Sequence, residues 1–263
     1  MAQRKRNPNP KRRRGKFVPR PRIGPDGEVI DPRVKMLEDW KPKTEIGRKV
    51  KVGEITTIEE ALNSGRKILE AEIVDALIPN LETEFINVGQ AKGKFGGGQR
   101  RIFKQTQKKT KDGNRIAFNA LAVVGNRDGY VGVGIGRSKE TVPAKDKALR
   151  NAKLNIMQIG RGNGSWESES PEPNSIPFEV CGRSGSVRVT FMPAPPGTGL
   201  VIENELKKLF RLAGIENVWS KSKGQTRQKI NLINATVKAL KQTATVRLKD
   251  QQKAVVRYGS INK

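Results

Sequence analysis

Three glycines on one side of a short alternating segment constrain the fold of this chain more than any other feature. Residues 130–136 alternate between apolar side chains and glycine, which predicts a strand with one bare face, made by Gly132, Gly134 and Gly136. Because nothing projects from that face, another backbone can approach it closely. The next segment, Lys139 to Met157, predicts a helix that fits there, since four-residue spacing relates Ala144, Ala148, Ala152 and Ile156.

This strand is one half of a predicted hairpin. Turn residues Gly125 to Gly129 separate it from Arg115–Val124, a run of β-branched and apolar residues. Leu81–Val88 and Arg100–Gln107 also predict strands. Strands followed by a helix predict a β-β-β-α domain over residues 81–160.

Two short helices are expected to lead into this domain, within residues 39–80. Thr57 and Glu60 have the spacing of a capping box at the start of one helix. The segment Glu70 to Leu77 repeats apolar residues with helical spacing and predicts the other.

A second domain is expected over residues 176–241, beyond a linker at 161–175 that is rich in glycine and proline. Its predicted order is strand, strand, rigid loop, helix, strand and helix. These elements are Ile176–Cys181 and Ser186–Met192, joined by Gly182–Gly185; the loop Pro193–Gly199; a helix with apolar residues from Val201 to Ala213, capped by Gly214; Ile215–Trp219; and Ile230–Leu240. A basic tail, 242–263, receives no assignment.

The charge of the chain indicates a polyanionic partner. The formal net charge is +26, with 52 Lys and Arg residues against 26 Asp and Glu. Ten of the basic residues fall within the first 22 positions, with four prolines and no acid, which predicts a disordered basic arm over residues 1–38. The arm alone could be a solubility or targeting tail. The rest of the chain, however, still carries 42 basic against 26 acidic residues, so we expect the folded part to bind nucleic acid as well.

The sequence disfavours an enzyme. It has no histidine, which removes the commonest general base and metal ligand. Its one cysteine, Cys181, can form neither an internal disulfide nor a zinc site built from cysteine pairs. No run approaches the roughly 18 apolar residues of a membrane span. We therefore expect no metal, no cofactor and no membrane association.

Two glycine-rich segments leave nucleotide chemistry as a minor alternative. Gly132–Gly136 lies inside a strand, where the dinucleotide fingerprint would need its glycines between a strand and a helix. The loop Pro196–Gly199 precedes a predicted helix and could bind an anion through its amides. It could equally be a rigid turn that packs against a partner.

Basic residues gather around the connections of the first domain, with almost no acid among them. Such residues contact RNA phosphates, which gives affinity and salt dependence without base specificity. A basic helix beside three strands is similar to modules that bind the A-form shape of double-stranded RNA. Tryptophans at 40, 166 and 219 are expected to be core or anchor residues rather than base-stacking platforms. The predicted RNA-binding residues are Lys92, Lys94, Arg100, Arg101, Lys104, Lys108, Lys109, Lys111, Gly113, Arg115, Arg127, Arg137, Lys139, Lys145, Lys147, Arg150, Lys153 and Arg183.

Several stretches resemble one known family, the fifth protein of the small ribosomal subunit. Residues 115–136 and 152–156 resemble its N-terminal domain, and residues 176–187, 193–199 and 212–215 resemble its C-terminal domain in the same order. Residues 40–47 and 162–166 resemble the archaeal branch of the family. The resemblance covers about Asp39 to Leu240.

The resemblance implies an α+β protein with a double-stranded-RNA-binding-like β-β-β-α domain, then a two-layer α/β domain with a left-handed β-α-β crossover. It implies a cytoplasmic, non-enzymatic constituent of the small ribosomal subunit that binds ribosomal RNA and supports decoding accuracy. The turn Lys111–Arg115 would reach RNA near the messenger entry region. Contact with ribosomal protein four is implied for Gly197, Thr198, Gly199 and Lys207.

Two features depart from the family pattern. The glycine-rich stretch Gly93 to Gln107 is longer than expected, and Pro196 stands where archaeal members commonly have an arginine.

Two further hypotheses for the function come from other classes of protein: a free RNA-binding regulator of structured transcripts, and an enzyme with a phosphate-binding loop.

Overall fold

The computed structural model describes residues 39–90, 100–163 and 172–245, together with Leu37 and the backbone of three two-residue strands. Those strands are β1 (Arg22–Ile23), β2 (Val29–Ile30) and β13 (Arg257–Tyr258). The chain divides into two units, residues 1–40 and 41–263. Within the first unit, β1 and β2 pair in an antiparallel sense. Most of the predicted arm, the middle of the predicted linker, the tail beyond residue 245, Lys92 and Lys94 lie outside the described residues.

Three short helices precede the first sheet, one more than the sequence predicted. They are α2 (Glu45–Val52), α3 (Ile58–Asn63) and α4 (Ala71–Leu77). The capping box at Thr57 and Glu60 is confirmed, with both reciprocal hydrogen bonds present. The missed helix, α2, begins where the Thr44 hydroxyl accepts a hydrogen bond from the Gly47 amide, 3.1 Å away.

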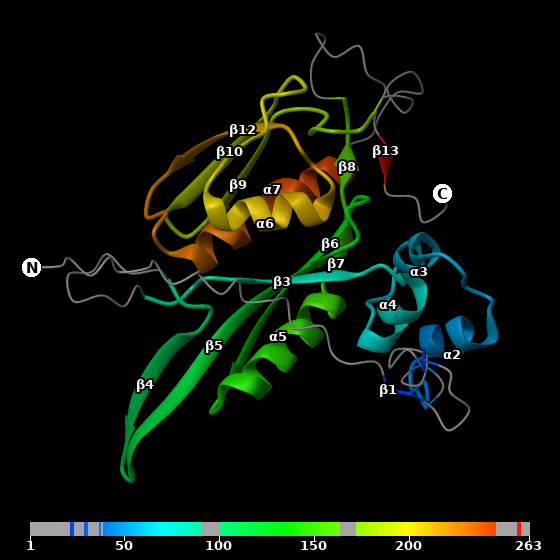
Figure 1. Cartoon of the computed structure of the whole chain (residues 1–263), viewed down its shortest axis with the longest axis vertical. Helices are drawn as coiled ribbons and strands as arrows, with labels where there is room; N and C mark the ends of the chain where they lie inside the picture. Colours follow the sequence, from blue (N-terminus) through cyan, green and yellow to red (C-terminus); the bar gives the residue numbers. More distant parts are fainter. Residues whose placement is uncertain are drawn as a thin grey trace, which may run out of the picture. The chain divides into compact units, whose positions relative to one another are not determined.

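The first sheet is antiparallel and has the order β3-β5-β6-β7. Its strands are β3 (Glu82–Ile86), β5 (Gly113–Gly125), β6 (Tyr130–Ser138) and β7 (Ile156–Gln158). Another strand, β4 (Lys104–Thr110), pairs with the outer half of β5, whereas β3 pairs with its inner half. The β4–β5 hairpin therefore extends beyond the rest of the sheet (Figure 1). The turn at Gly125–Gly129 is confirmed, and each predicted strand overlaps an observed one, although β4 covers Lys104–Thr110 instead of Arg100–Gln107. Four strands of this sheet, rather than the three of the predicted β-β-β-α order, therefore precede the helix.

The predicted contact between glycines and alanines is confirmed in helix α5 (Thr141–Leu154). A Cβ added at Gly134 would lie 2.1 Å from the Ala152 nitrogen and 2.4 Å from the Ala148 oxygen. The helix is shorter than predicted, because it ends at Leu154 and Ile156 belongs to β7. Paired with Gly132 of β6, Ile156 continues the sheet instead of the helix.

The second sheet has the order β11-β12-β10-β9. Its strands are β9 (Val180–Ser184), β10 (Val187–Pro193), β11 (Leu200–Val201) and β12 (Val218–Lys223). Helices α6 (Asn204–Ala213) and α7 (Lys229–Thr245) belong with it. β11 and β12 are parallel, and the other neighbours are antiparallel. A further short strand, β8 (Gly160–Arg161), pairs with β13.

The prediction that Gly182 to Gly185 form the turn of the second hairpin was wrong in register. Gly182 lies within β9 and pairs with Val189, while the turn is made by Gly185 and Ser186. The reason is steric: a Cβ at Gly182 would lie 2.0 Å from the Ala235 oxygen of α7. Here a glycine marks close packing of a helix on a strand.

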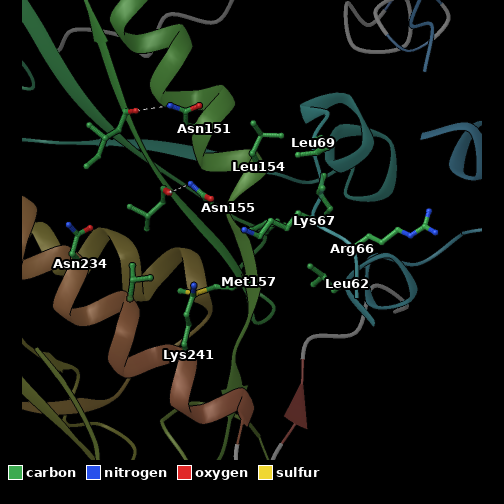
Figure 2. Close-up of a pocket in the computed structure, with 15 residues that line it drawn as sticks. Leu62, Arg66, Lys67, Leu69, Asn151, Leu154, Asn155, Met157, Asn234 and Lys241 are labelled. Carbon is green, nitrogen blue, oxygen red and sulfur yellow. Dashed lines mark hydrogen bonds between the residues drawn. The ribbon is translucent and has the colours of Figure 1, made fainter. Parts of the chain in front are cut away.

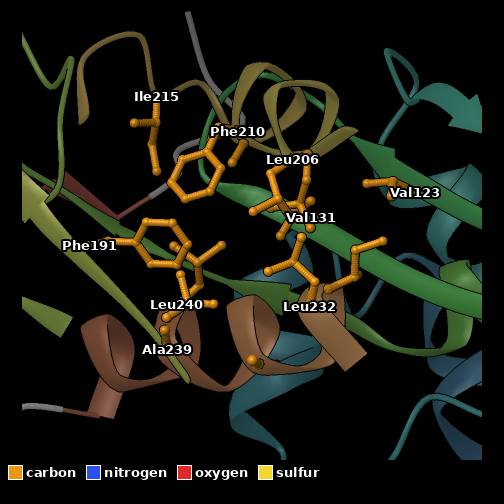
Figure 3. Packing of buried hydrophobic residues seen from close by; sticks show 14 of the residues in the cluster. Val123, Val131, Phe191, Leu206, Phe210, Ile215, Leu232, Ala239 and Leu240 are labelled. Atoms are coloured by element: carbon orange, nitrogen blue, oxygen red, sulfur yellow. The ribbon is translucent and has the colours of Figure 1, made fainter. Parts of the chain in front are cut away.

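The layers of residues 41–263 follow the order α5, first sheet, α6 with α7, second sheet. One apolar core fills the space between the two sheets, and Figure 3 shows Val131 of β6 near Leu206 and Leu232 of the middle helices. Within this core the rings of Phe191 and Phe210 lie 4.9 Å apart between centroids. The two predicted domains therefore share a single hydrophobic core.

Backbone contacts also join the two halves. The turn before β6 meets the end of α6, where the Arg127 amide donates to the Leu212 carbonyl at 2.9 Å and the Gly129 amide donates to Ala213 at 3.1 Å. Gly214, which caps α6 in a left-handed conformation, is forced by space as well, since its Cβ would lie 2.0 Å from the Arg127 oxygen.

Candidate nucleic-acid interface

Strand register sorts the predicted RNA-binding residues onto two sides of the β4–β5 hairpin. Directly paired residues of antiparallel strands share a face. Lys104 pairs with Asn119, which pairs in turn with Arg137 of β6, and Lys108 pairs with Arg115. We call these four basic residues, Lys104, Lys108, Arg115 and Arg137, the hairpin face.

The hairpin face continues the side on which β5 enters the core. Leu121 and Val123 are buried there, an even number of residues from Arg115, so the strand changes from apolar to basic along a single side. Lys109 pairs with Asn114 and lies on the other side, which is the side of α5. The C-terminal half of β5 therefore packs in the core, and its N-terminal half presents positive charge on the same side.

The tip of the hairpin is a tight, exposed turn. Gly113 has a φ of +110°, a conformation that favours glycine, and Lys111 beside it is exposed. Arg115 lies 3.9 Å from Asp112, but both side chains are well exposed and such a pair contributes little to stability. The tip is therefore free to contact a partner.

Several predicted RNA-binding residues have partners inside the protein. Arg127 makes two hydrogen bonds to Glu82 at 2.7 and 3.0 Å, and Lys153 pairs with Asp75 at 2.6 Å. The Arg100 guanidinium donates to the Arg227 carbonyl at 3.1 Å, which links the start of β4 to the loop after β12. These side chains therefore make contacts within the protein as well as carrying charge.

Lys145 is held by aromatic rings. Its ammonium lies 5.5 Å from the ring centroid of Phe85 and 5.4 Å from that of Phe103, within the range of cation–π attraction. The other basic residues predicted around α5 are exposed: Arg101, Lys139, Lys147 and Arg150.

The loop predicted to contact a protein partner is irregular, and it does not lead directly into a helix, as the alternative of an anion site at a helix entrance would require. Gly197 and Gly199 have φ angles of +89° and +70°. Two strand residues follow, so α6 begins only at Asn204. Its first amides face the Glu203 side chain, which accepts a hydrogen bond from Glu205 N at 3.0 Å. The Glu203 carboxylate therefore already accepts a hydrogen bond from one of the amides that an anion would use.

The same loop borders a cavity of about 690 Å³. Gly199 and Lys207 both line it, so two of the residues predicted to contact a protein partner lie together. The walls carry Glu82, Glu84 and Glu216 opposite Arg161 and Arg211, a mixture of charges that is unsuited to a nucleic acid.

A second cavity, of about 830 Å³, lies between α5, β6, α7 and the loop after α3 (Figure 2). Asn151 donates to the Ile135 carbonyl at 2.8 Å and fixes the end of α5 on β6. The lining combines apolar residues with amides and three basic residues, Arg66, Lys67 and Lys241. It contains no carboxylate, hydroxyl or thiol that could act as a nucleophile or general base.

A partly buried carboxylate joins the two halves. Glu205 of α6 accepts hydrogen bonds from the backbone and side-chain nitrogens of Asn87, both at 2.9 Å, and from Lys208 at 2.9 Å. Burial alone would raise the pKa of Glu205, but these bonds outweigh it and the pKa lies below its ordinary value. The pKa of Tyr130 is raised by burial and by Glu59, whose carboxylate accepts a hydrogen bond from the Tyr130 hydroxyl at 2.9 Å.

The structure also places Arg183 in an arrangement that the sequence did not indicate. It is exposed on β9 and stands beside Arg188 of β10, which pairs in turn with Lys223 of β12. The sequence alone did not indicate this row, because the alignment of the three residues depends on strand pairing. Trp219, expected to be a core or anchor residue, is 41% exposed on the same sheet.

Neither metal nor membrane features accompany these basic surfaces. The described parts of the chain contain no cluster of three or more potential metal-ligating side chains. Among the same residues, no helix has the length and apolar character that a membrane crossing requires.

Comparison with known protein families defines the class. The family model for ribosomal protein S5, N-terminal domain, matches residues 102–160, and the model for the C-terminal domain of the same protein matches residues 182–254. The chain thus carries both domains of a ribosomal protein of this type, in the expected order.

Curated relatives define the family more closely. Small ribosomal subunit protein uS5 of Nanoarchaeum equitans is 49% identical over 212 residues, which cover 81% of this chain and 91% of the relative. The uS5 proteins of Thermoplasma volcanium and Pyrobaculum aerophilum are 46% and 43% identical, over 81% and 88% of this chain and 90% and 96% of the relatives. The chain therefore belongs to the small ribosomal subunit protein uS5 family, whose members are structural and non-enzymatic. The resemblance expected from the sequence is confirmed.

Proposed function

We propose that this chain is a constituent of the small ribosomal subunit that binds ribosomal RNA through the β4–β5 hairpin and α5, and that it acts in the cytoplasm. The single observation that carries the proposal is the hairpin face. Lys104, Lys108 and Arg115 lie on the two-stranded β4–β5 projection, and Arg137 lies on the adjoining strand β6, on the same side of the sheet.

The kind of RNA follows from what the hairpin face lacks. Its rows combine basic residues with Asn119, Ala117 and Thr106, and none of its residues is aromatic. Such a surface suits the phosphates of a helix rather than stacked, unpaired bases. We accordingly propose that residues 81–160 act as a double-stranded-RNA-binding-like domain, with Arg101, Lys139, Lys147 and Arg150 as further phosphate contacts.

The second half of the proposal concerns protein neighbours. Gly197, Thr198, Gly199 and Lys207 would contact ribosomal protein four, and this contact would support decoding accuracy near the messenger entry region. The cavity of mixed charge that Gly199 and Lys207 border supports a protein partner over an RNA partner. The β-α-β unit formed by β11, α6 and β12, whose parallel strands need a crossover, would have the left-handed connection of the family.

Fractionation of native cell extract on a sucrose gradient in high-salt buffer tests the proposal. Retention of the protein at one copy per small subunit is the expected result. A constituent bound only through surface charge would be released by salt, whereas an integral component resists it. Recovery at the top of the gradient would contradict the proposal and favour a free RNA-binding regulator.

A variant with Gly199 and Lys207 both replaced by alanine separates the two halves of the function. We expect it to remain in the small-subunit peak, because the hairpin face is unchanged, and to raise misreading of a reporter codon. Unchanged misreading would contradict the role proposed for the loop. Lys238→Ala, at an exposed position of α7, is the control.

A further inference from the structure

The second sheet has one covered face and one open face. Helices α6 and α7 lie against the side on which Val187, Val189 and Phe191 of β10 are buried. The alternate residues of β10 point the other way, and Arg188 there is exposed. No described element covers this outer face, which forms the last layer of the fold (Figure 1).

A row of three basic residues crosses the outer face. Arg183 of β9 pairs with Arg188 of β10, and Arg188 pairs with Lys223 of β12. Adjacent strands are about 4.8 Å apart, so three positive charges stand within roughly 10 Å of each other. Like charges directly opposite are unfavourable for folding. None of the ion pairs formed among residues 39–90, 100–163 and 172–245 involves these three residues.

A row of apolar residues crosses the other end of the same face. Trp219 of β12 pairs with Met192 of β10 on one side and with Val201 of β11 on the other. Trp219 is 41% exposed and Val201 is 52% exposed. Lys221, also exposed, stands between this row and the basic row. Glu179, a carboxylate that precedes β9, is exposed.

The outer face therefore combines an aromatic surface with positive charge, about 13 Å apart along β12 at the usual rise per residue. A chain of unpaired nucleotides has the matching chemistry, because each unit offers an aromatic base and a phosphate. A duplex hides its bases inside the helix and would leave the apolar row exposed to water. The apolar row thus distinguishes this face from the hairpin face.

We propose that the outer face of the second sheet binds single-stranded RNA, with a base stacked on Trp219 and phosphates bound by Lys221 and by the row Arg183, Arg188 and Lys223. This site is separate from the hairpin face and does not depend on it. Base stacking on an aromatic side chain stabilises such complexes by about 1 to 3 kcal/mol per base. Sequence preference is weak in this mode, since every base has an aromatic face.

Fluorescence of the full chain tests the proposal. With Trp40 and Trp166 replaced by phenylalanine, Trp219 remains as the single tryptophan. Titration with an unstructured oligouridine of about ten nucleotides should quench its emission, while a blunt RNA duplex of equal charge should not. Equal quenching by the duplex would overturn the proposal, and so would equal quenching by polyglutamate, which would indicate a docking face for an acidic protein.

Variants assign the two rows. In unmodified background, Trp219→Ala should weaken oligouridine binding about 5- to 100-fold, whereas Trp219→Phe should largely preserve it. Replacing Arg188 and Lys223 with glutamine should lower the salt slope by about 1.4, the value for two phosphate contacts on a single strand.

The matched control is the pair Lys108→Gln and Lys109→Gln on the hairpin, which should leave oligouridine binding unchanged. All of these side chains are exposed, so thermal unfolding should stay within a few degrees of the parent chain. If the Lys108→Gln and Lys109→Gln pair weakened oligouridine binding and Trp219→Ala did not, the assignment of the site to the outer face would be overturned. This test is independent of the sedimentation experiment.

Discussion

The two sheets of this protein solve the same packing problem differently. The first sheet lies between α5 and the pair α6 and α7, so its inner half is covered on both faces and its charge is displaced outward along the β4–β5 hairpin. The second sheet is covered on one face only, and its charge lies directly over the core. A basic surface can therefore be separated from a core either along the length of a strand, as in the hairpin, or across the thickness of a sheet, as in the second sheet. Only the first arrangement makes the surface independent of the core.

The largest expected effect concerns the core that the sheets share. Phe210→Ala should lower the free energy of unfolding by about 4 kcal/mol, because it removes a fully buried ring packed on Phe191. Hydrogen exchange should show the amides of β5 and β6 losing protection together with those of β10 and β12. Val142→Ala, at an exposed site on α5, is the control and should change stability by less than about 0.5 kcal/mol. If β5 and β6 kept their protection while β10 and β12 lost theirs, the two halves would be independently folding domains.

The next effect compares how each sheet receives its helix. Gly134→Ala should cost about 3 kcal/mol, since its Cβ meets α5 backbone and the contacts at Gly132 and Gly136 prevent the helix from tilting away. Gly182→Ala should cost about 1 to 2 kcal/mol, because α7 meets the second sheet so closely at that one point and can pivot. Chemical denaturation measures both. A larger loss for Gly182→Ala would reverse the ranking of the two contacts.

A smaller, pH-dependent effect concerns the polar contact between the halves. The pKa of Glu205 is lowered, so its ionised form stabilises the fold above its ordinary pKa and this stability is lost as the pH falls through the folded-state pKa. Glu205→Gln should therefore cost about 1 to 2 kcal/mol at neutral pH, and this cost should shrink as the pH falls through the folded-state pKa of the parent carboxyl. Urea denaturation at several pH values measures the difference. A cost that did not change with pH would assign the effect to packing.

The smallest effect on stability is expected at the hairpin. Lys108→Ala and Lys109→Ala should each leave thermal unfolding unchanged, because both side chains are exposed beyond the core. Each should lower the salt slope for duplex RNA by about 0.9 if its side of the hairpin contacts a phosphate. Since the two residues lie on opposite sides, a slope that changes for only one of them would identify the side that faces RNA.

Local sequence patterns predicted most of the first half of the fold. The glycines at 132, 134 and 136 and the alanines of α5 specify each other, so the contact could be inferred without a structure. The same logic failed at Gly182, because a glycine between two strand segments is as typical of a turn as of close packing. Ile156 was assigned to the helix because its spacing fits both a helix and the strand that follows.

The candidate site was predictable in composition but not in arrangement. Lys104, Lys108 and Arg115 could be selected from their charge, yet their common face depends on the pairing of β4 with β5. The row on the second sheet was missed because Arg188 and Lys223 are 35 residues apart and meet only through β10 and β12. Partners such as Glu82 for Arg127 were likewise invisible, since they come from distant segments.

The turn before β6 has a consequence for the order of synthesis. Its amides at Arg127 and Gly129 bind carbonyls of Leu212 and Ala213, about 85 residues later in the chain. A ribosome that adds about 5 to 20 residues per second needs roughly 4 to 17 seconds to cover that interval. Until then, those strands of the first sheet that have been made have no α6 to cover their inner apolar face. The first half of this protein can reach its final form only after most of the second half has been translated.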